Sequence, residues 1–354
     1  MKRFLILALL TPAAQAWAAG YPVPSQGDFT IRNFRFETGE ELTELKIHYR
    51  TIGSPSRDSN GVVRNAVLIL HGTGGAGTQF LTEQFADVLF GAGQLLDASK
   101  YFIILPDNIG HGESSKPSNG LHARFPHYCY HDMVRAQYRL LREKLKIDHL
   151  RLVTGTSMGG MHTWVWGETY SDFMDALMPL ASLPVEIAGR NRMMRRMVLD
   201  SIRNDPEWSG GEYKSQPRGL TCAIYTLLFM TSSPLQWQRQ YPTRAAADQF
   251  FDETVRARLE RTDANDMLYQ FDASRDYNPA PELENIRAPL AAINSADDQV
   301  NPPELGVMEQ AIKRVRRGKY VLIPISDRTR GHGTHSLPSI WKDYLSELLI
   351  ESQR

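Results

Sequence analysis

Short, largely apolar runs without polar alternation recur along this chain, and they predict strands that are buried on both faces, as in a parallel sheet. These runs span residues 66–70, 101–105, 150–153, 176–181, 289–293 and 320–325. Residues 29–36 and 43–49 instead alternate polar and apolar positions, and they predict two further, paired strands.

Helical periodicity separates these strands, with segments at residues 80–89, 132–145, 161–169, 304–315 and 340–350. Alternation of strands and helices favours an α/β fold, with a mostly parallel, doubly wound sheet that has helices on both faces.

The alternation stops between residues 184 and 285, where helical patterns, Trp and Tyr residues and the break Asn204-Asp205-Pro206 occur. We expect a helical lid here, inserted between two core parts at residues 19–183 and 286–354. A solvated helix face is the simplest explanation of its arginines, and binding of an acidic substrate is the alternative. These arginines are Arg190, Arg192, Arg195 and Arg196.

The N-terminal residues 1–18 have the pattern of a cleaved secretory signal peptide: a basic start, an apolar run over residues 4–10, and small-x-small sites ending at residues 16 and 18. The apolar run is far shorter than the roughly 20 residues that span a bilayer. We therefore expect a periplasmic or secreted protein with no membrane association after cleavage.

Composition indicates an ordinary globular protein of 354 residues. Lys plus Arg and Asp plus Glu number 40 each, so no net charge recruits nucleic acid. We expect a small-molecule partner. Cys129 and Cys222 could pair in an oxidising compartment or remain free thiols, and the sequence leaves both open.

A candidate nucleophile follows the apolar run 150–153. The turn Gly155-Thr156-Ser157-Met158-Gly159 leads into a helical pattern, and strand, tight turn and helix are the context of the G-x-S-x-G nucleophile elbow of α/β-hydrolases. Ser157 is therefore the predicted nucleophile, and it requires a general base.

The acid and the base should follow late strands, in the order Ser, Asp, His. Asp298 is the predicted acid, because it follows the run 289–293 and stands four residues before Pro302. Asp297 is the alternative acid, and the carboxylate that is not the acid would then be a plain loop charge. His332 follows the run 320–325, with His335 as the alternative.

An oxyanion hole needs backbone N–H donors, and the Gly-rich loop 71–75 follows the strand run 66–70. We expect Thr73 and Met158 to supply these donors. The loop lacks the Lys-Ser/Thr pair of a P-loop, and His127 and His131 lack the Glu of H-E-x-x-H, so no cofactor or metal is expected.

Several runs resemble the homoserine O-acetyltransferase family, namely Phe125-Pro126, residues 131–137, 157–161, 204–213, Gly219-Leu220, 298–303 and Gly331-His332. The resemblance covers residue 30 to the end. It implies an α/β-hydrolase core with a helical lid, double displacement through an acyl-serine, and triad roles for Ser157, Asp298 and His332. Members of this family are often dimers, so a homodimer is a possibility.

Departures from that family change the expected reaction. Gly333 stands where an Asp usually follows the histidine, and the loop 71–75 lacks the usual His-Ala-Leu-Thr-Gly. Leu199 aligns with the arginine that is expected to bind the homoserine carboxylate. Arg195, Arg196 and Arg203 lie nearby in the sequence, so this alignment leaves the position of such an arginine open. Acetyl-coenzyme A should also be scarce outside the cytoplasm. We therefore expect a carboxylic-ester hydrolase. An O-acyltransferase using an acyl-CoA donor is the alternative, followed by a non-catalytic binding protein on the same scaffold.

Overall fold

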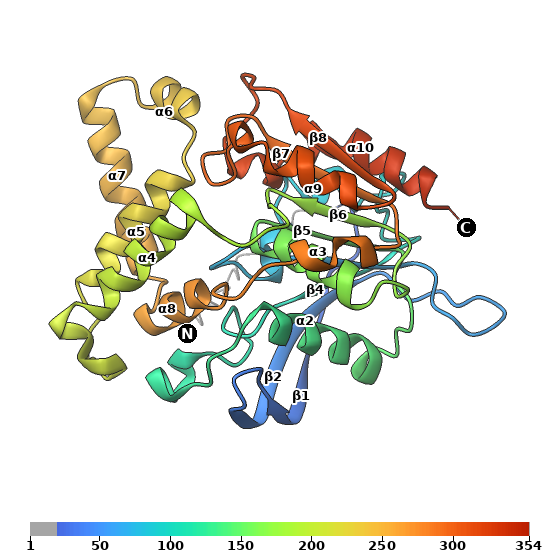
Figure 1. The fold of residues 1–354 in the computed structure, drawn as a ribbon, viewed down its shortest axis with the longest axis horizontal. Helices are drawn as coiled ribbons and strands as arrows, with labels where there is room; N and C mark the ends of the chain where they lie inside the picture. The colour runs from blue at the N-terminus through green and yellow to red at the C-terminus, as the bar shows by residue number, and fades with distance from the viewer. Residues whose placement is uncertain (1–19, 354) are drawn as a thin grey trace, which may run out of the picture.

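The computed structural model describes residues 20–353, and the predicted signal peptide, residues 1–18, lies outside this range. The strands form one eight-stranded sheet in the order β1-β2-β4-β3-β5-β6-β7-β8 (Figure 1). Only β2 runs antiparallel to its neighbours, and all pairs from β4 to β8 are parallel. The strands are β1 (Ser25–Arg35), β2 (Glu41–Ile52), β3 (Ala66–Leu70), β4 (Phe102–Pro106), β5 (Leu152–Thr156), β6 (Leu177–Leu180), β7 (Leu290–Ser295) and β8 (Gly318–Ile323).

Five of the six predicted buried strands are buried for the expected reason. The prediction is wrong for the run 320–325, because β8 lies at the edge of the sheet and leaves Leu322 exposed, and Ile325 just beyond the strand is exposed as well. Every residue of β3 to β7 is buried, because helices cover both faces of the sheet. Side chains of α2 (Tyr130–Arg139), α3 (Met158–Thr169) and α9 (Val307–Ala311) belong to the core on one face. Those of α1 (Ala86–Leu89) and α10 (Pro338–Glu351) belong to the core on the other. The α/β-hydrolase architecture expected from the sequence is confirmed.

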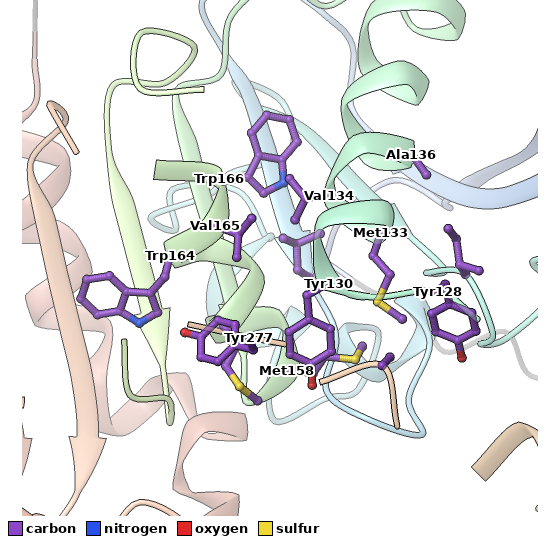
Figure 2. Close-up of a cluster of buried hydrophobic side chains, with 14 of the residues drawn as sticks. Tyr128, Tyr130, Met133, Val134, Ala136, Met158, Trp164, Val165, Trp166 and Tyr277 are labelled. Atoms are coloured by element: carbon purple, nitrogen blue, oxygen red, sulfur yellow. The ribbon is translucent and has the colours of Figure 1, made fainter. Parts of the chain in front are cut away.

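Aromatic side chains fill the space between α2 and α3 (Figure 2). Trp164 and Trp166 of α3 are fully buried, and the ring of Tyr130 lies 5.6 Å from that of Tyr277. Burial of such large rings contributes about 3–5 kcal/mol each, judged by truncation to Ala. Because α3 begins directly after Ser157, this packing holds the turn that carries the serine.

Five helices lie to one side of the sheet, between the end of β6 and the start of β7 (Figure 1). They are α4 (Gly189–Arg203), α5 (Gly219–Met230), α6 (Pro234–Gln240), α7 (Arg244–Leu259) and α8 (Ala264–Asp272). They occupy the segment in which the strand-helix alternation stops, and the short helices η5 (Pro206–Gly211) and η6 (Ala280–Asn285) follow α4 and α8. We refer to residues 184–285 as the lid.

Two predicted helices are broken in the structure. Residues 80–89 form only the end of the 3-10 turn η1 (Gly77–Phe80) and the four-residue α1, because Phe80 and Phe85 pack on the sheet face instead of following one helix stripe. Within 304–315, Gly306 adopts a left-handed conformation (φ 62°) and separates η7 (Pro303–Leu305) from α9, which continues into η8 (Ile312–Arg314). Among residues 20–353, no helix is long and apolar enough to cross a membrane.

Candidate active site

Ser157 lies in the tight turn between β5 and α3, at the carboxyl end of a central strand. Its backbone is strained, with φ 55° and ψ −112°, a conformation that L-residues rarely adopt. The Ser157 N–H donates a hydrogen bond to Leu180 O at 2.9 Å, which ties the turn to the neighbouring strand β6. The sheet and α3 therefore hold the serine in a conformation that its local sequence would not choose.

Gly155 and Gly159, on either side of Ser157, must lack side chains because neighbouring backbone segments approach them closely. A Cβ on Gly155 would lie 2.4 Å from the carbonyl of Gly159, and one on Gly159 would lie 1.9 Å from Leu70 O. These distances are far below van der Waals contact, so neither position can hold a side chain unless the strand or helix moves.

Ser157, His332 and Asp298 form one hydrogen-bonded chain. Ser157 and His332 are 175 residues apart in the sequence, and His332 and Asp298 are 34 residues apart. His332 Nε2 lies 2.8 Å from Ser157 Oγ, and His332 Nδ1 lies 2.8 Å from Asp298 Oδ2. Asp298 follows β7, and His332 lies in the loop between β8 and α10. The three candidates that the sequence placed after separate strands thus converge at the carboxyl edge of the sheet.

The Asp298 carboxylate is buried and strongly hydrogen-bonded. Burial alone raises the pKa of this carboxyl, but the charge of His332 and hydrogen bonds from His332, Asn301 and Val300 outweigh it, and the pKa lies below its usual value. Asn301 Nδ2 donates to Asp298 Oδ2 at 3.1 Å and to Ala181 O at 2.9 Å. The acid is therefore held ionised and oriented toward the imidazole.

Asp297 and His335, the alternatives weighed for the acid and the base, do not join this chain. Asp297 Oδ2 accepts a hydrogen bond from the Gly331 N–H at 2.9 Å, and Oδ1 accepts one from Ser295 Oγ at 2.5 Å. The expectation of a plain loop charge is wrong, since this buried carboxylate holds the backbone just before His332. His335 packs edge-on against His332 with ring centroids 5.3 Å apart, and burial lowers its pKa to about 3.

The Gly-rich loop predicted for the oxyanion hole lies against the serine. A Cβ on Gly72 would be 3.5 Å from Ser157 Cβ. The side chain of Gln79 fixes the loop: its Oε1 accepts a hydrogen bond from the Gly72 N–H at 3.1 Å, and its Nε2 donates one to Thr156 Oγ1 at 2.9 Å. The Met158 N–H belongs to the first turn of α3, which has no intrahelical acceptor for it. The sequence offered no signal for Gln79.

A cavity of about 320 Å³ opens beside Ser157. Core residues including Thr73 and His332 line one side, and lid residues including Arg195, Arg258 and Phe271 line the other. A second cavity of about 750 Å³ shares part of this lining and extends it between the lid and the loops after β3 and β4. A substrate bound at Ser157 would thus lie between the sheet edge and the lid.

Arg195 corrects the reading of the lid arginines as a solvated face. It is 4 % exposed, and its Nε and Nη1 donate to Asn191 Oδ1 at 3.0 Å and Ser274 Oγ at 2.9 Å. Leu199, one helical turn later and aligned with the arginine of the resembled family, is instead 1 % exposed in the hydrophobic core. An arginine does reach the cavity beside Ser157, but from a different position of α4.

The remaining candidates have other surroundings. Cys129 is a buried free thiol and Cys222 an exposed one, so the structure has no bridge between them. His127 stacks on Tyr269 with ring centroids 4.8 Å apart, and Asp132 accepts from the Cys129 N–H at the start of α2. Within residues 20–353, no group of His, Cys, Asp or Glu has the arrangement of a metal site.

Comparison with known proteins places these features in a family. Residues 65–324 match the model of the alpha/beta hydrolase fold family. A homoserine O-acetyltransferase of Pelobacter propionicus is 31 % identical, covering 84 % of this chain and 88 % of its own. A probable acyltransferase of Methanothermobacter thermautotrophicus is 29 % identical, covering 80 % of this chain and 86 % of its own. An acetylester hydrolase of Corynebacterium glutamicum has a similar fold, with a TM-score of 0.80 at 21 % identity over 92 % of this chain and 96 % of its own.

Proposed function

The chain belongs to the homoserine O-acetyltransferase-like group of the alpha/beta hydrolase fold family, and from that premise we propose that it is a carboxylic-ester hydrolase that acts through an acyl-serine. One observation carries the proposal: Ser157 Oγ, the His332 imidazole and the Asp298 carboxylate form a continuous chain with both links at 2.8 Å. This is the geometry that a serine needs for activation by a general base.

In the proposed first half-reaction, Ser157 Oγ attacks the ester carbonyl carbon while its proton passes to His332 Nε2. The tetrahedral oxyanion faces the backbone N–H groups of Thr73 and Met158. The intermediate then collapses: the bond to the alkoxy oxygen breaks, His332 returns the proton to it, and the alcohol leaves. Ser157 remains as an ester of the acyl group, and Asp298 stabilises the transient imidazolium.

The second half-reaction repeats these steps with water. His332 takes a proton from the water as its oxygen attacks the acyl carbonyl, and the second intermediate collapses to the carboxylic acid and free Ser157. No cofactor or metal takes part in this scheme. All the groups it needs come from the chain and the solvent.

An O-acyltransferase is the second candidate, supported by two relatives of 29–31 % identity, a probable acyltransferase and a homoserine O-acetyltransferase. An alcohol acceptor such as homoserine would then resolve the same acyl-serine that water resolves in the hydrolase. Two features of the chain favour water as the acyl acceptor. Gly333 follows the histidine where the family usually has Asp, and Leu199 stands at the position that aligns with the family's substrate-binding arginine.

A paired assay on the purified protein separates the two candidates. One arm measures hydrolysis of p-nitrophenyl acetate and butyrate, and the other measures thiol release from acetyl-coenzyme A with and without homoserine. Ester hydrolysis that is lost in Ser157→Ala, with fluorophosphonate labelling of Ser157 in the wild type, supports the hydrolase. Homoserine-dependent thiol release faster than ester hydrolysis would overturn it. Equal rates for wild type and Ser157→Ala, with no labelling, would point to a non-catalytic binding protein.

We also propose export and self-association. Export is supported by the signal-like pattern of residues 1–18, and N-terminal sequencing of the mature protein from a periplasmic fraction tests it. A homodimer is supported by exposed apolar side chains on the lid, among them Met193, Met197 and Phe229. Light scattering of the wild type and of Phe229→Asp tests the dimer, and an equal monomer mass for both would contradict it.

A further inference from the structure

Two lid arginines line the cavity at Ser157 without an acidic partner. Arg195 projects from α4 and Arg258 from α7, so the two reach the same cavity from different helices. Among residues 20–353, neither forms an ion pair with Asp or Glu, whereas five other arginines of the lid do, namely Arg196, Arg203, Arg218, Arg239 and Arg275. The described lining of this cavity contains no carboxylate at all.

Arg195 is held as a buried cation with part of its hydrogen-bonding capacity free. Nε and one N–H of Nη1 are engaged by Asn191 and Ser274, and the remaining N–H groups form no hydrogen bond of ordinary geometry within residues 20–353. The guanidinium also lies 5.6 Å from the ring centre of Phe271. A fixed guanidinium that keeps the N–H groups of Nη2 and one N–H of Nη1 available matches a two-oxygen anion.

The hydroxyl of Tyr130 adds a second free polar group. It is fully buried and makes no hydrogen bond that meets ordinary geometry. Burial raises its pKa, and the nearby Arg195, Ser274 and Thr73 partly offset this rise. Buried polar groups are nearly always satisfied. Tyr130 lines neither cavity, so its hydroxyl contributes to the polar surroundings of Arg195 and Thr73 and is not itself a ligand-binding position.

Arg258 stands where the two cavities meet. It lines both the 320 Å³ cavity at Ser157 and the 750 Å³ cavity beside it. Its Nε is buried and has no hydrogen-bond partner within the described residues. Burial and the charge of Arg261 lower its pKa, which means that the cation is poorly compensated by its surroundings.

We propose that the Ser157 cavity selects esters that carry a carboxylate, which Arg195 and Arg258 bind. Without such a group, two guanidinium ions line a cavity whose own lining holds no carboxylate, and the carboxylates of Glu113, Asp263 and Asp266 line only the adjoining cavity. Leaving buried cations without a counter-charge is costly. A bound carboxylate neutralises them and accepts the free N–H groups. This inference rests on the proposed ester hydrolysis and names the class of ester.

The experiment compares charged and neutral esters of the same size. In one arm the carboxylate is on the alcohol portion (4-acetoxybenzoate against 4-acetoxybenzamide), and in the other it is on the acyl portion (monomethyl glutarate against methyl 4-carbamoylbutanoate). We expect kcat/KM to favour the anionic ester in at least one arm by about tenfold or more, the range of a charge-assisted hydrogen bond. The arm that shows the preference identifies the portion of the ester that carries the anion.

Variants assign the preference to the two arginines. Arg195→Met and Arg258→Met should each reduce the anionic-to-neutral ratio of kcat/KM by about tenfold, with Arg258→Lys retaining part of it. Arg196→Met is the matched control, because Arg196 is exposed on the same helix as Arg195 and pairs with Asp200. Thermal melting checks folding, and if Arg195→Met fails to fold, Arg258→Met carries the test.

Failure of this inference differs from failure of the proposed function. Hydrolysis of charged and neutral esters with equal kcat/KM in both arms, unchanged in Arg258→Met, would overturn the carboxylate specificity and leave the hydrolase standing. Absence of Ser157-dependent hydrolysis of any of the four esters or of p-nitrophenyl acetate would overturn both.

Discussion

Asp297 Oδ2 accepts a hydrogen bond from the Gly331 N–H at 2.9 Å, so the carboxylate next to Asp298, the proposed triad acid, holds the residue before His332, the proposed base. Ser233 Oγ of the lid also lies 3.3 Å from this carboxylate. Asp297 and Asp298 thus divide two tasks between adjacent residues: one positions the loop, and the other orients the imidazole.

Asp297→Ala should lower kcat for p-nitrophenyl acetate about tenfold with little change in KM, because small displacements of a catalytic group are expensive. Asp297→Asn should recover much of the loss, since its amide oxygen can still accept from Gly331. A loss shared equally by the Ala and Asn variants, or expressed in KM alone, would contradict this positioning role.

Asp298→Asn should be far more damaging, with kcat reduced by about 10³-fold or more, because an amide can neither fix the productive tautomer of His332 nor stabilise its charged form. Steady-state kinetics gives the loss, and a parallel decrease in the rate of fluorophosphonate labelling of Ser157 locates it at the nucleophile. Wild-type labelling by this variant would remove Asp298 from the triad.

Gln79→Leu tests the clamp on the oxyanion loop. The substitution keeps the approximate size but removes both hydrogen bonds, to the Gly72 N–H and to Thr156 Oγ1. We expect kcat to decrease about 10- to 100-fold, less than the loss of a direct oxyanion donor, because the N–H of Thr73 is misplaced rather than absent. Unchanged kcat in a folded variant would show that the loop keeps its position without Gln79.

Gly159→Ala should prevent stable folding or cost about 3 kcal/mol or more, because its Cβ would collide with the backbone carbonyl of Leu70, which no side-chain rotation can relieve. Gly333→Ala is the control. A Cβ on Gly333 would lie 3.8 Å from Arg330 Cβ, an ordinary contact distance. Thermal denaturation of both variants measures the difference, and similar melting temperatures would contradict the close-packing argument.

Glu168→Gln should stabilise the protein more at pH 8 than at pH 5. Burial and the charge of Glu282 raise the pKa of Glu168 to about 8, and its buried Oε2 has no hydrogen-bond partner among the described residues. A carboxyl whose folded pKa is raised binds its proton more tightly when folded, so stability is lost as pH rises from about 4.5 to 8. Gln cannot ionise, and the variant should lack this loss.

Melting temperatures across this pH range check the prediction, and the expected gain at pH 8 is a few degrees. Glu186→Gln, an exposed site, should leave the pH profile unchanged. A gain from Glu168→Gln that is equal at pH 5 and pH 8 would contradict ionisation as the cause.

Much of the site was predictable because its members follow strands. Ser157 has a local signature, and Asp298 and His332 come after runs that end at one edge of a parallel sheet. Choosing between Asp297 and Asp298 required the fold, since adjacent carboxylates differ only in which neighbour each faces. No sequence pattern indicated the roles of Gln79 and Arg258, because a single polar residue in a loop or an amphipathic helix is common and predicts no particular contact.

By itself, the sequence determined the α/β-hydrolase architecture, the order of strands and lid along the chain, and the turn that carries Ser157, because periodicity and glycine requirements are local properties. The tertiary structure alone decided which arginine of α4 lines the cavity beside Ser157. Arg195 and Leu199 lie one helical turn apart, and only the packing of the lid against the sheet edge places the first in the cavity and the second in the core. Such a choice depends on contacts between residues far apart in the chain, which no local pattern encodes.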